Sequence, residues 1–268
     1  MNRVETYYDS NPDGEWDRLG THRVEYGITL RALQDHLPPA PSRIVDIGGG
    51  VGRYAIELTR RRHDVTITDV SRRCLDLARR KAAEAGMALA GCHRADARDL
   101  SAFEDDHFDA ALLMGPLYHL LAHSQRLEAV REAQRVLRPG GRVFAAFIAR
   151  YAVVQYGLAE RPEYIAESGE ELETILQTGE YRRPEGSSGF IDAWFAHPAE
   201  VAPLMEEGGF QPLALLGCEC LACFMEEKIN AAEDELHEQW LDLLYGLAGE
   251  PSLLGGSGHM LYVGCKAP

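Results

Sequence analysis

The segment from Val45 to Gly52, which reads Val-Asp-Ile-Gly-Gly-Gly-Val-Gly, connects a short apolar run to a helical pattern and restricts the fold more than any other stretch. Glycine lets a backbone take positive φ and approach a ligand closely, so these glycines predict a tight turn between a buried strand and a helix. The free N–H groups and the dipole at the start of that helix would face whatever the turn binds. The segment therefore predicts a nucleotide-type binding turn.

Asp46 narrows the choice of ligand for this turn. A dinucleotide site places a pyrophosphate here, and a carboxylate two residues before the first glycine would repel it. A ligand with a cationic amino-acid part would instead be attracted. The spacing Asp46-x-Gly48-x-Gly50-x-Gly52 resembles motif I of the class I S-adenosylmethionine (SAM) dependent methyltransferases. An ordinary glycine-rich turn of another α/β protein is the alternative, and the rest of the chain has to decide between them.

Strand and helix patterns alternate after this turn, which predicts a doubly wound, mainly parallel sheet. The β-branched run at residues 64–70 holds Asp69 at its end, where nucleotide-binding folds use an acid to accept hydrogen bonds from ribose hydroxyls. Ser71 is expected to cap the next helix, which Gly86 closes. The other expected strands cover residues 89–94, 108–114, 142–148, 210–220 and 259–265.

Three further features strengthen the resemblance to the methyltransferase family. Asp96 stands at the position that contacts adenine in the family, and Gly-Pro-Leu-Tyr-His-Leu at residues 115–120 stands where the family's motif IV lies beside the transferred methyl group. The segment Val136–Gly141, with its Arg-Pro-Gly-Gly turn, is typical of the approach to the fifth strand. The order of these features over residues 43–148 is similar to bacterial class I methyltransferases that carry the Gly-Pro-Leu-Tyr-His-Leu segment.

The resemblance implies a Rossmann-like class I methyltransferase fold in the α/β class, with a seven-stranded sheet whose last strand is inserted antiparallel. It also implies SAM as the cofactor. The cofactor-binding residues that it implies are Tyr8, Asp46, Gly48, Gly49, Gly50, Gly52, Asp69, Val70, Asp96, Ala97 and Met114.

Two segments outside this core are expected to complete the site. Residues 1–42 form an N-terminal segment, polar and turn-rich at first and then one long helix from Glu15 to Leu37, which by resemblance folds over the cofactor of the domain 43–268. Residues 150–195 interrupt the alternation after the fifth strand and predict a lid that carries substrate recognition. The substrate contacts expected from these segments are Tyr7, His22, Tyr151, Asp192 and Trp194, with Glu15 and Glu25 as further polar candidates; the alternative is that the rings only pack and the charges face water.

The methyl group of SAM is already activated, so the protein must mainly align donor and acceptor. A hydroxyl or ammonium acceptor also needs a base. His119 is the leading candidate because it follows the fourth strand and titrates near neutrality, and Tyr118 could orient the acceptor. A packed structural histidine is the alternative, and His22 and His259 are weaker candidates.

The charge balance limits the partners. With 27 basic and 42 acidic residues, the formal net charge is -15, which disfavours nucleic acid and anionic membrane surfaces because both need a basic face. The N-terminus lacks the apolar core of a signal peptide, so a cytoplasmic monomer or homodimer acting on a small molecule is expected.

Cys218, Cys220 and Cys223 are the three clustered members of the six cysteines. They could serve a thiol or arsenic methyltransferase, but no second ligand pair with zinc spacing follows, and no metal is expected. A SAM-binding regulatory module without turnover is the other alternative, since the cofactor residues serve both equally.

Overall fold

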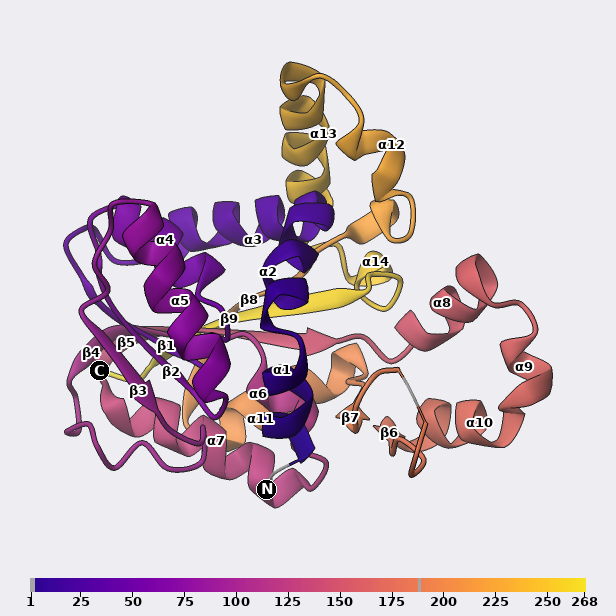
Figure 1. Ribbon diagram of the computed structural model, residues 1–268, viewed down its shortest axis with the longest axis horizontal. Coiled ribbons are helices and arrows are strands. Elements are labelled where there is room, and N and C mark those ends of the chain that lie inside the picture. The colour runs from indigo at the N-terminus through magenta and orange to yellow at the C-terminus, as the bar shows by residue number, and fades with distance from the viewer. Residues whose placement is uncertain (1–2, 188) are drawn as a thin grey trace.

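The computed structural model describes residues 3–187 and 189–268 and places them around one seven-stranded sheet (Figure 1). The strand order is β3-β2-β1-β4-β5-β9-β8, with β9 antiparallel to both of its neighbours. The order reverses between β1 and β4, which is where open α/β sheets bind ligands. The strands are β1 (Arg43–Ile47), β2 (Asp64–Asp69), β3 (Gly91–Arg94), β4 (Phe108–Leu113), β5 (Leu137–Ile148), β8 (Phe210–Gly217) and β9 (His259–Lys266).

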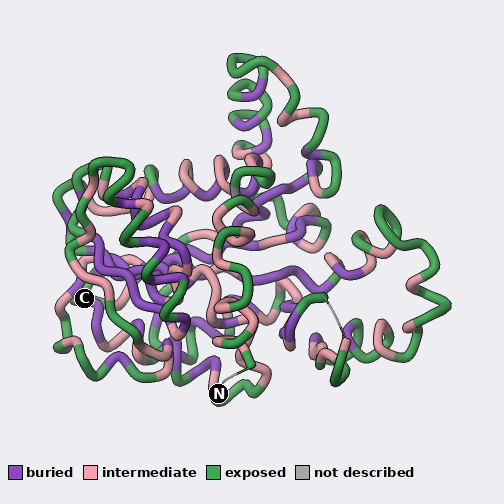
Figure 2. Tube along the Cα trace, viewed as in Figure 1, coloured by how far each residue is buried: buried purple, intermediate pink, exposed green. Residues whose placement is uncertain are grey.

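Alternate residues of the central strands pack on opposite faces of the sheet, as the period of a strand requires. On one face, the even-numbered residues Ile44 and Leu112 pack among α3, α4, α5 and α13. On the other face, Val45 and Leu113 pack under α7 and α11. Buried residues therefore follow the strands, while the outer faces of these helices are exposed (Figure 2). The helices that follow the N-terminal segment are α4 (Arg53–Arg60), α5 (Arg72–Glu84), α6 (Pro116–His119), α7 (His123–Val136) and α11 (Pro198–Glu207).

The N-terminal segment is three helices, α1 (Arg3–Ser10), α2 (Pro12–Thr21) and α3 (Arg23–His36). The predictions of a turn-rich start and one long helix were therefore wrong. The backbone breaks at His22 (φ -94°, ψ 62°), whose N–H still bonds to the carbonyl of Arg18. No residue of α1 is buried, so α1 lacks the apolar stripe that reveals a helix in a sequence.

The approach to β5 confirms the expected sharp turn. Leu137 already pairs with Phe108, but the register resumes only at Arg142 opposite Ala110. The four residues between them bulge out of the ladder, with Gly140 at φ 74°.

The segment after β5 forms an arm that projects from the sheet (Figure 1). Its elements are α8 (Ala152–Glu160), α9 (Tyr164–Glu167), α10 (Gly169–Thr178) and a two-stranded sheet of β6 (Glu180–Tyr181) and β7 (Ala193–Trp194). A small cluster that includes Ile148, Ile175 and Phe195 packs the arm against the end of β5.

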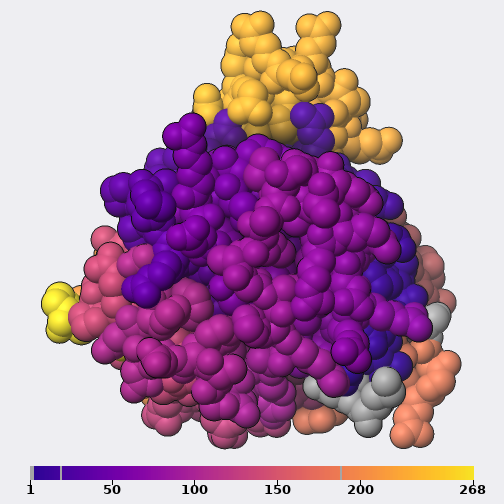
Figure 3. Space-filling model, turned by 60° about the vertical axis from the view of Figure 1, so that its left-hand side comes forward, coloured from indigo at the N-terminus to yellow at the C-terminus, as the bar shows by residue number. Residues whose placement is uncertain are grey.

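The chain between β8 and β9 holds a second projection, seen at the top of Figure 3. It comprises a 3₁₀ turn (Cys220–Ala222), α12 (Glu226–Asn230), α13 (Asp234–Leu247) and α14 (Pro251–Leu254). The sixth strand thus ends at Gly217, before the residue predicted. Among the described residues, no helix has both the length and the apolar character needed to cross a bilayer.

Candidate functional site

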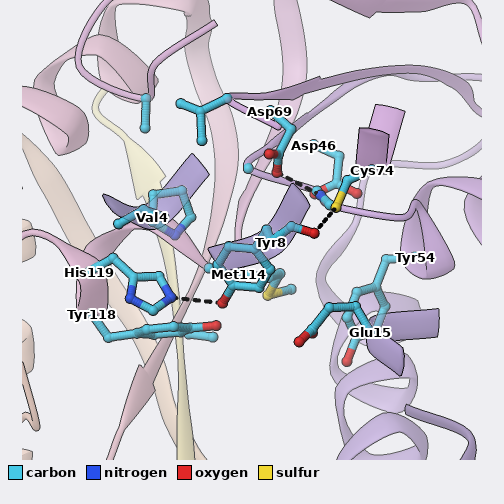
Figure 4. Close-up of a pocket in the computed structure, with 18 of the residues that line it drawn as sticks. Val4, Tyr8, Glu15, Asp46, Tyr54, Asp69, Cys74, Met114, Tyr118 and His119 are labelled. Carbon is cyan, nitrogen blue, oxygen red and sulfur yellow. Dashed lines mark hydrogen bonds between the residues drawn. The ribbon is translucent and has the colours of Figure 1, made fainter. Parts of the chain in front are cut away.

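A cavity of about 530 Å³ lies at the carboxyl ends of β1, β2 and β4, with α1 and α2 among its walls (Figure 4). The residues expected to bind the cofactor that do line it are Tyr8, Asp46, Gly48, Gly49, Gly50, Asp69, Val70, Asp96, Ala97 and Met114. Tyr118 and His119 line it as well. The cavity thus brings together side chains from both ends of the chain.

The glycine turn has the geometry that the sequence predicts. Gly48, Gly50 and Gly52 have φ values of 67°, 55° and 81°, a region in which other residues are strained. A Cβ on Gly48 would lie 2.4 Å from Pro116, whereas one on Gly50 would meet no atom within 4 Å. Gly52 does not line the cavity; it caps α4, and a Cβ there would lie 3.0 Å from Ala78.

Asp46 is buried beside this turn, and within the described part of the chain neither of its carboxylate oxygens has a hydrogen-bond partner. Buried polar groups almost always have partners. Burial, with a smaller contribution from Asp69, raises the pKa of Asp46 to about 7. A cationic or N–H-bearing part of a ligand would satisfy this carboxylate, and the amino-acid part of SAM has such a group.

Asp69 fixes the turn from the next strand. Its two carboxylate oxygens accept hydrogen bonds from the backbone N–H groups of Gly50 (2.9 Å) and Ser71 (2.7 Å). Burial raises its pKa to about 6, although these backbone donors oppose the shift. Each oxygen keeps a lone pair, so the carboxylate is able to accept hydroxyl donors as well.

Asp96 is held by a close partner. The guanidinium of Arg98 donates to its two oxygens at 2.9 and 2.7 Å, and these hydrogen bonds lower the pKa of Asp96. The carboxylate is therefore ionised and oriented where it lines the cavity.

His119 lies between α1 and the arm. Its Nδ1 is 3.1 Å from the carbonyl oxygen of Asp192, and its Nε2 is 2.7 Å from the hydroxyl of Tyr8 (Figure 4). A carbonyl only accepts, so Nδ1 carries the proton and Nε2 accepts from Tyr8. Burial lowers the pKa of His119 to about 4 and raises that of Tyr8 well above its ordinary value. The imidazole is thus neutral, with both nitrogens engaged, and does not face an acceptor as a free base.

Tyr118 packs edge-on to His119 at 4.7 Å between ring centroids. Burial raises its pKa to about 12. Its ring, like the side chain of Met114, lines the cavity (Figure 4).

The structure places five residues that were expected to contact substrate outside the cavity lining: Tyr7, His22, Tyr151, Asp192 and Trp194. Trp194 is buried in the core, edge-on to Phe147, with the guanidinium of Arg126 3.8 Å above its ring. The carboxylate of Asp192 is bound by Arg3 at 3.1 Å and by the backbone N–H of Arg183 at 2.9 Å.

The other three have partners of their own. Tyr7 packs edge-on to Tyr8. His22 lies 3.6 Å from the carboxylate of Glu226. Tyr151 is exposed and packs against His197. The contacts of Trp194 and Asp192 therefore attach the arm to the rest of the protein, which agrees with the alternative that the rings of this segment only pack.

A group of ionisable residues that the sequence did not bring together also lines the cavity: Glu15, Arg18, Glu25 and His259. We call this group the polar end. Glu15 and Glu25 were candidates, whereas Arg18 was missed. The sequence did hold one indication that His259 reaches the cavity. It begins the last, antiparallel strand, and this position places it opposite Ile148 at the carboxyl end of β5.

The three clustered cysteines point to different partners. Cys218 lines the cavity and contacts the hydroxyl of Thr29, while the thiols of Cys220 and Cys223 donate to Gly217 and Gln155. Burial raises the pKa of all three thiols, to about 11 for Cys220 and about 12 for Cys223. Thiolates are the nucleophilic and metal-binding form, so this arrangement does not support a thiolate site.

Comparisons with known proteins agree with this geometry. A family model described as "Methyltransferase domain" matches residues 44–141. The ubiquinone biosynthesis O-methyltransferase of Ralstonia nicotianae is 28% identical over 209 residues, which is 78% of each chain. The ubiquinone/menaquinone biosynthesis C-methyltransferase of Bartonella quintana is 33% identical over 130 residues, 46% of this chain and 47% of the relative.

A solved structure from Thermotoga maritima, described as a SAM-dependent methyltransferase and possible histamine N-methyltransferase, has the same fold. Its TM-score is 0.57 at 19% identity, over 97% of this chain and 98% of that one. The motif order, the sheet topology, the unpartnered aspartate beside the glycine turn and these relatives agree. Residues 44–141 thus match a methyltransferase domain, and the chain as a whole is similar to class I SAM-dependent methyltransferases in motif order and sheet topology.

Proposed function

We propose that the protein transfers the methyl group of SAM to a small molecule bound in the polar end of the cavity. The observation that carries this proposal is that one cavity contains both the unpartnered carboxylate of Asp46 and a second set of ionisable side chains, the polar end. The cofactor accounts for Asp46, but it gives no role to the ionisable side chains of the polar end.

The size and walls of the cavity support a small acceptor. Ligand pockets of about 300 to 1,000 Å³ enclose most of the surface of a small molecule, and this cavity of about 530 Å³ has helices α1 and α2 over it. The acidic balance of the chain also disfavours a nucleic-acid acceptor. The O- and C-methyltransferases among the relatives are named for quinone biosynthesis.

We assign the cofactor to the glycine-turn side of the cavity. Asp46 would meet the ammonium of its amino-acid part, Asp69 its ribose hydroxyls, and Asp96 and Ala97 its adenine. When bound, SAM supplies an activated methyl group, so the protein needs only to align the acceptor. Tyr118 and Met114 would flank the transfer, and His119 would position Tyr8 through their hydrogen bond.

The arm at residues 150–195 is proposed to support this site from outside. Its Asp192 carbonyl fixes the ring of His119 and its carboxylate binds Arg3 of α1. In this proposal the arm holds the N-terminal cover in place and does not itself grip the substrate.

Calorimetric titration with S-adenosylhomocysteine tests the cofactor assignment. We expect micromolar binding by the wild type and at least about tenfold weaker binding by Asp69→Ala, because two ribose hydrogen bonds to a charged group are lost. Asp76→Ala, an exposed acid on α5, is the matched control and should bind as the wild type does. Absence of wild-type binding would contradict the proposal, and binding without turnover on a broad acceptor panel would favour a SAM-binding module.

A further inference from the structure

The polar end and Glu219, which binds His259 but does not line the cavity, form a chain of ionisable groups that runs from α2 to the start of β9. Arg18 donates to Oε2 of Glu25 at 3.2 Å, the same oxygen lies 3.8 Å from Nδ1 of His259, and that nitrogen lies 2.6 Å from Oε1 of Glu219. Glu15 adds a carboxylate 3.7 Å from Arg18. These five groups come from four separate segments, so the fold has to assemble them.

His259 has the geometry of an oriented base. Its Nδ1 lies 2.6 Å from Glu219, whose second oxygen accepts from the hydroxyl of Ser257 and the backbone N–H of His259, both at 2.8 Å. A carboxylate held in this way keeps the proton of a neutral imidazole on Nδ1. His259 lines the cavity and Glu219 does not. Among the described residues Nε2 has no hydrogen-bond partner, so it is the nitrogen that is free to take a proton from an acceptor.

The charges of the polar end leave room for one more cation. With His259 in the neutral form that acts as a base, the three carboxylates of Glu15, Glu25 and Glu219 face one cation of this group, Arg18. Arg18 and His259 already occupy Glu25 and Glu219, whereas the only ionic contact of Glu15 within the described chain is the 3.7 Å contact with Arg18. Burial raises the pKa of Glu15, which indicates that its charge is incompletely compensated.

A ligand with a single positive charge would balance this excess negative charge better than a divalent cation, a neutral hydroxyl compound or a carboxylate. Ligand atoms of Glu25, Glu219 and His259 do lie within 4.8 Å of one another, but a divalent cation would have to displace the hydrogen bond between His259 and Glu219 and would lie beside the guanidinium of Arg18. A phenol or alcohol brings no charge to Glu15, and a carboxylate acceptor would be repelled by it.

Resting on the proposed function, we propose that the methyl acceptor is a small amine, bound as its ammonium form near Glu15 and deprotonated by Nε2 of His259. The amine loses one N–H proton to Nε2, its lone pair then forms the N–C bond to the methyl carbon, and the C–S bond breaks. The proton leaves His259 to solvent in the next cycle. Glu219 is a positioning residue, because it acts only through the imidazole.

The pKa of the ammonium group that gives up the proton is close to the pKa of His259, which takes it. Burial alone would lower the pKa of His259, but the carboxylates of Glu25 and Glu219 outweigh it and raise the pKa to about 9. Alkylammonium groups titrate near 10, so the proton transfer to neutral His259 is nearly balanced, and the rate should rise toward about pH 9 as that neutral form becomes populated.

Binding to the S-adenosylhomocysteine complex tests the acceptor class without turnover. Three probes of similar size carry an amine, a phenol and a carboxylate respectively, namely 2-phenylethylamine, 4-ethylphenol and 3-phenylpropionate, with butylamine as an amine that lacks a ring. We expect the amines to bind at least about tenfold more tightly than the phenol and the carboxylate, and Glu15→Gln to remove most of that preference. Glu207→Gln, which changes an exposed glutamate outside the cavity lining, is the control.

The outcomes separate the two proposals. Tighter binding of the phenol or the carboxylate, or no binding of either amine to a complex that does form, would overturn the amine assignment. Failure of S-adenosylhomocysteine to bind would instead contradict the cofactor assignment.

The base is tested by pH profiles and by the imidazole itself. With an amine that turns over, His259→Gln should lower kcat about 100-fold or more. Glu219→Gln should leave KM unchanged but shift the alkaline-rising limb of the rate profile to lower pH, and NMR titration should show the same shift in the ring of His259. The exposed pair His123 and Glu207, 2.9 Å apart, supplies the controls His123→Gln and Glu207→Gln. An unchanged limb in Glu219→Gln, or a His259→Gln variant with wild-type kcat, would overturn the role of His259.

Discussion

Replacing Asp46 by asparagine should stabilise the ligand-free protein while weakening its hold on the cofactor. The side chain is 1% exposed and neither oxygen has a partner in the described part of the chain. Its ionised form is therefore disfavoured by folding. Asparagine keeps the shape and removes the charge.

The magnitude follows from the shift in pKa. Burial and Asp69 move the pKa of Asp46 from 3.8 to about 7, and each unit corresponds to about 1.4 kcal/mol. The charged form thus costs the folded protein roughly 4 kcal/mol at pH 8. An unsatisfied buried amide costs about 1–3 kcal/mol, so the net gain for Asp46→Asn should be about 1–3 kcal/mol.

The sign also fixes how this gain depends on pH. The folded pKa is raised, so the penalty is absent below the unfolded value of about 4, grows between pH 4 and 7, and is complete above pH 7. At pH 5.5 the advantage of the variant should be about 2 kcal/mol smaller than at pH 8.

Urea denaturation of the ligand-free proteins at pH 8 and pH 5.5, with calorimetry of S-adenosylhomocysteine, measures both effects. Asp76→Asn, whose side chain is 63% exposed, is the control and should change neither. A variant that is less stable than the wild type at pH 8, or whose advantage does not vary with pH, would refute the reasoning. Unchanged affinity for S-adenosylhomocysteine would show that Asp46 does not face the ligand.

Other parts of the site make simpler predictions. Tyr8→Phe leaves Nε2 of the half-buried His119 without its donor, so the free energy of unfolding in urea should fall by about 1–3 kcal/mol; an unchanged value would mean that this hydrogen bond is not formed in solution. Serine at Cys218, Cys220 and Cys223 together should leave methyl transfer intact in a homocysteine-release assay, and loss of activity in a folded variant would revive the thiol alternative. Dialysis against EDTA should leave the same activity unchanged, whereas a loss restored by one divalent metal would point to a metal site.

The parts of this site that could be predicted are those built by short pieces of chain. Asp46 and the glycines belong to one strand, turn and helix, so their spacing alone placed them correctly. Asp69 followed because the end of the next parallel strand must lie at the same edge. The alternation of strands and helices predicted the parallel part of the sheet, whereas the antiparallel insertion of the last strand was predicted only from the family resemblance.

The polar end could not be predicted because its members meet only through the tertiary fold. Glu25 and His259 are far apart in sequence, and no periodicity relates them. Trp194 and Asp192 were predicted to contact the substrate because aromatic and acidic residues close together in sequence are typical of binding sites. The same residues can also anchor a segment to the core, and only their tertiary contacts distinguish the two roles. The helix α1 escaped detection because it has no fully buried residue and is held by single aromatic and polar contacts, which leave no helical period in the sequence.

The way α1 is attached has a consequence for the speed of the enzyme. The helix buries no residue fully, yet it contributes Tyr8 to the cavity wall. Its ties are the packing of Tyr8 against Val51, Cys74 and Leu77 and two polar contacts, Glu5 to Arg94 at 2.6 Å and Asp9 to the hydroxyl of Ser71 at 2.6 Å. A helix that buries little apolar area and is held partly by an ion pair opens more readily than a core helix, and its opening responds to salt. Higher ionic strength should therefore speed product release. The same opening would admit water to the cavity and loosen the alignment of the reactants.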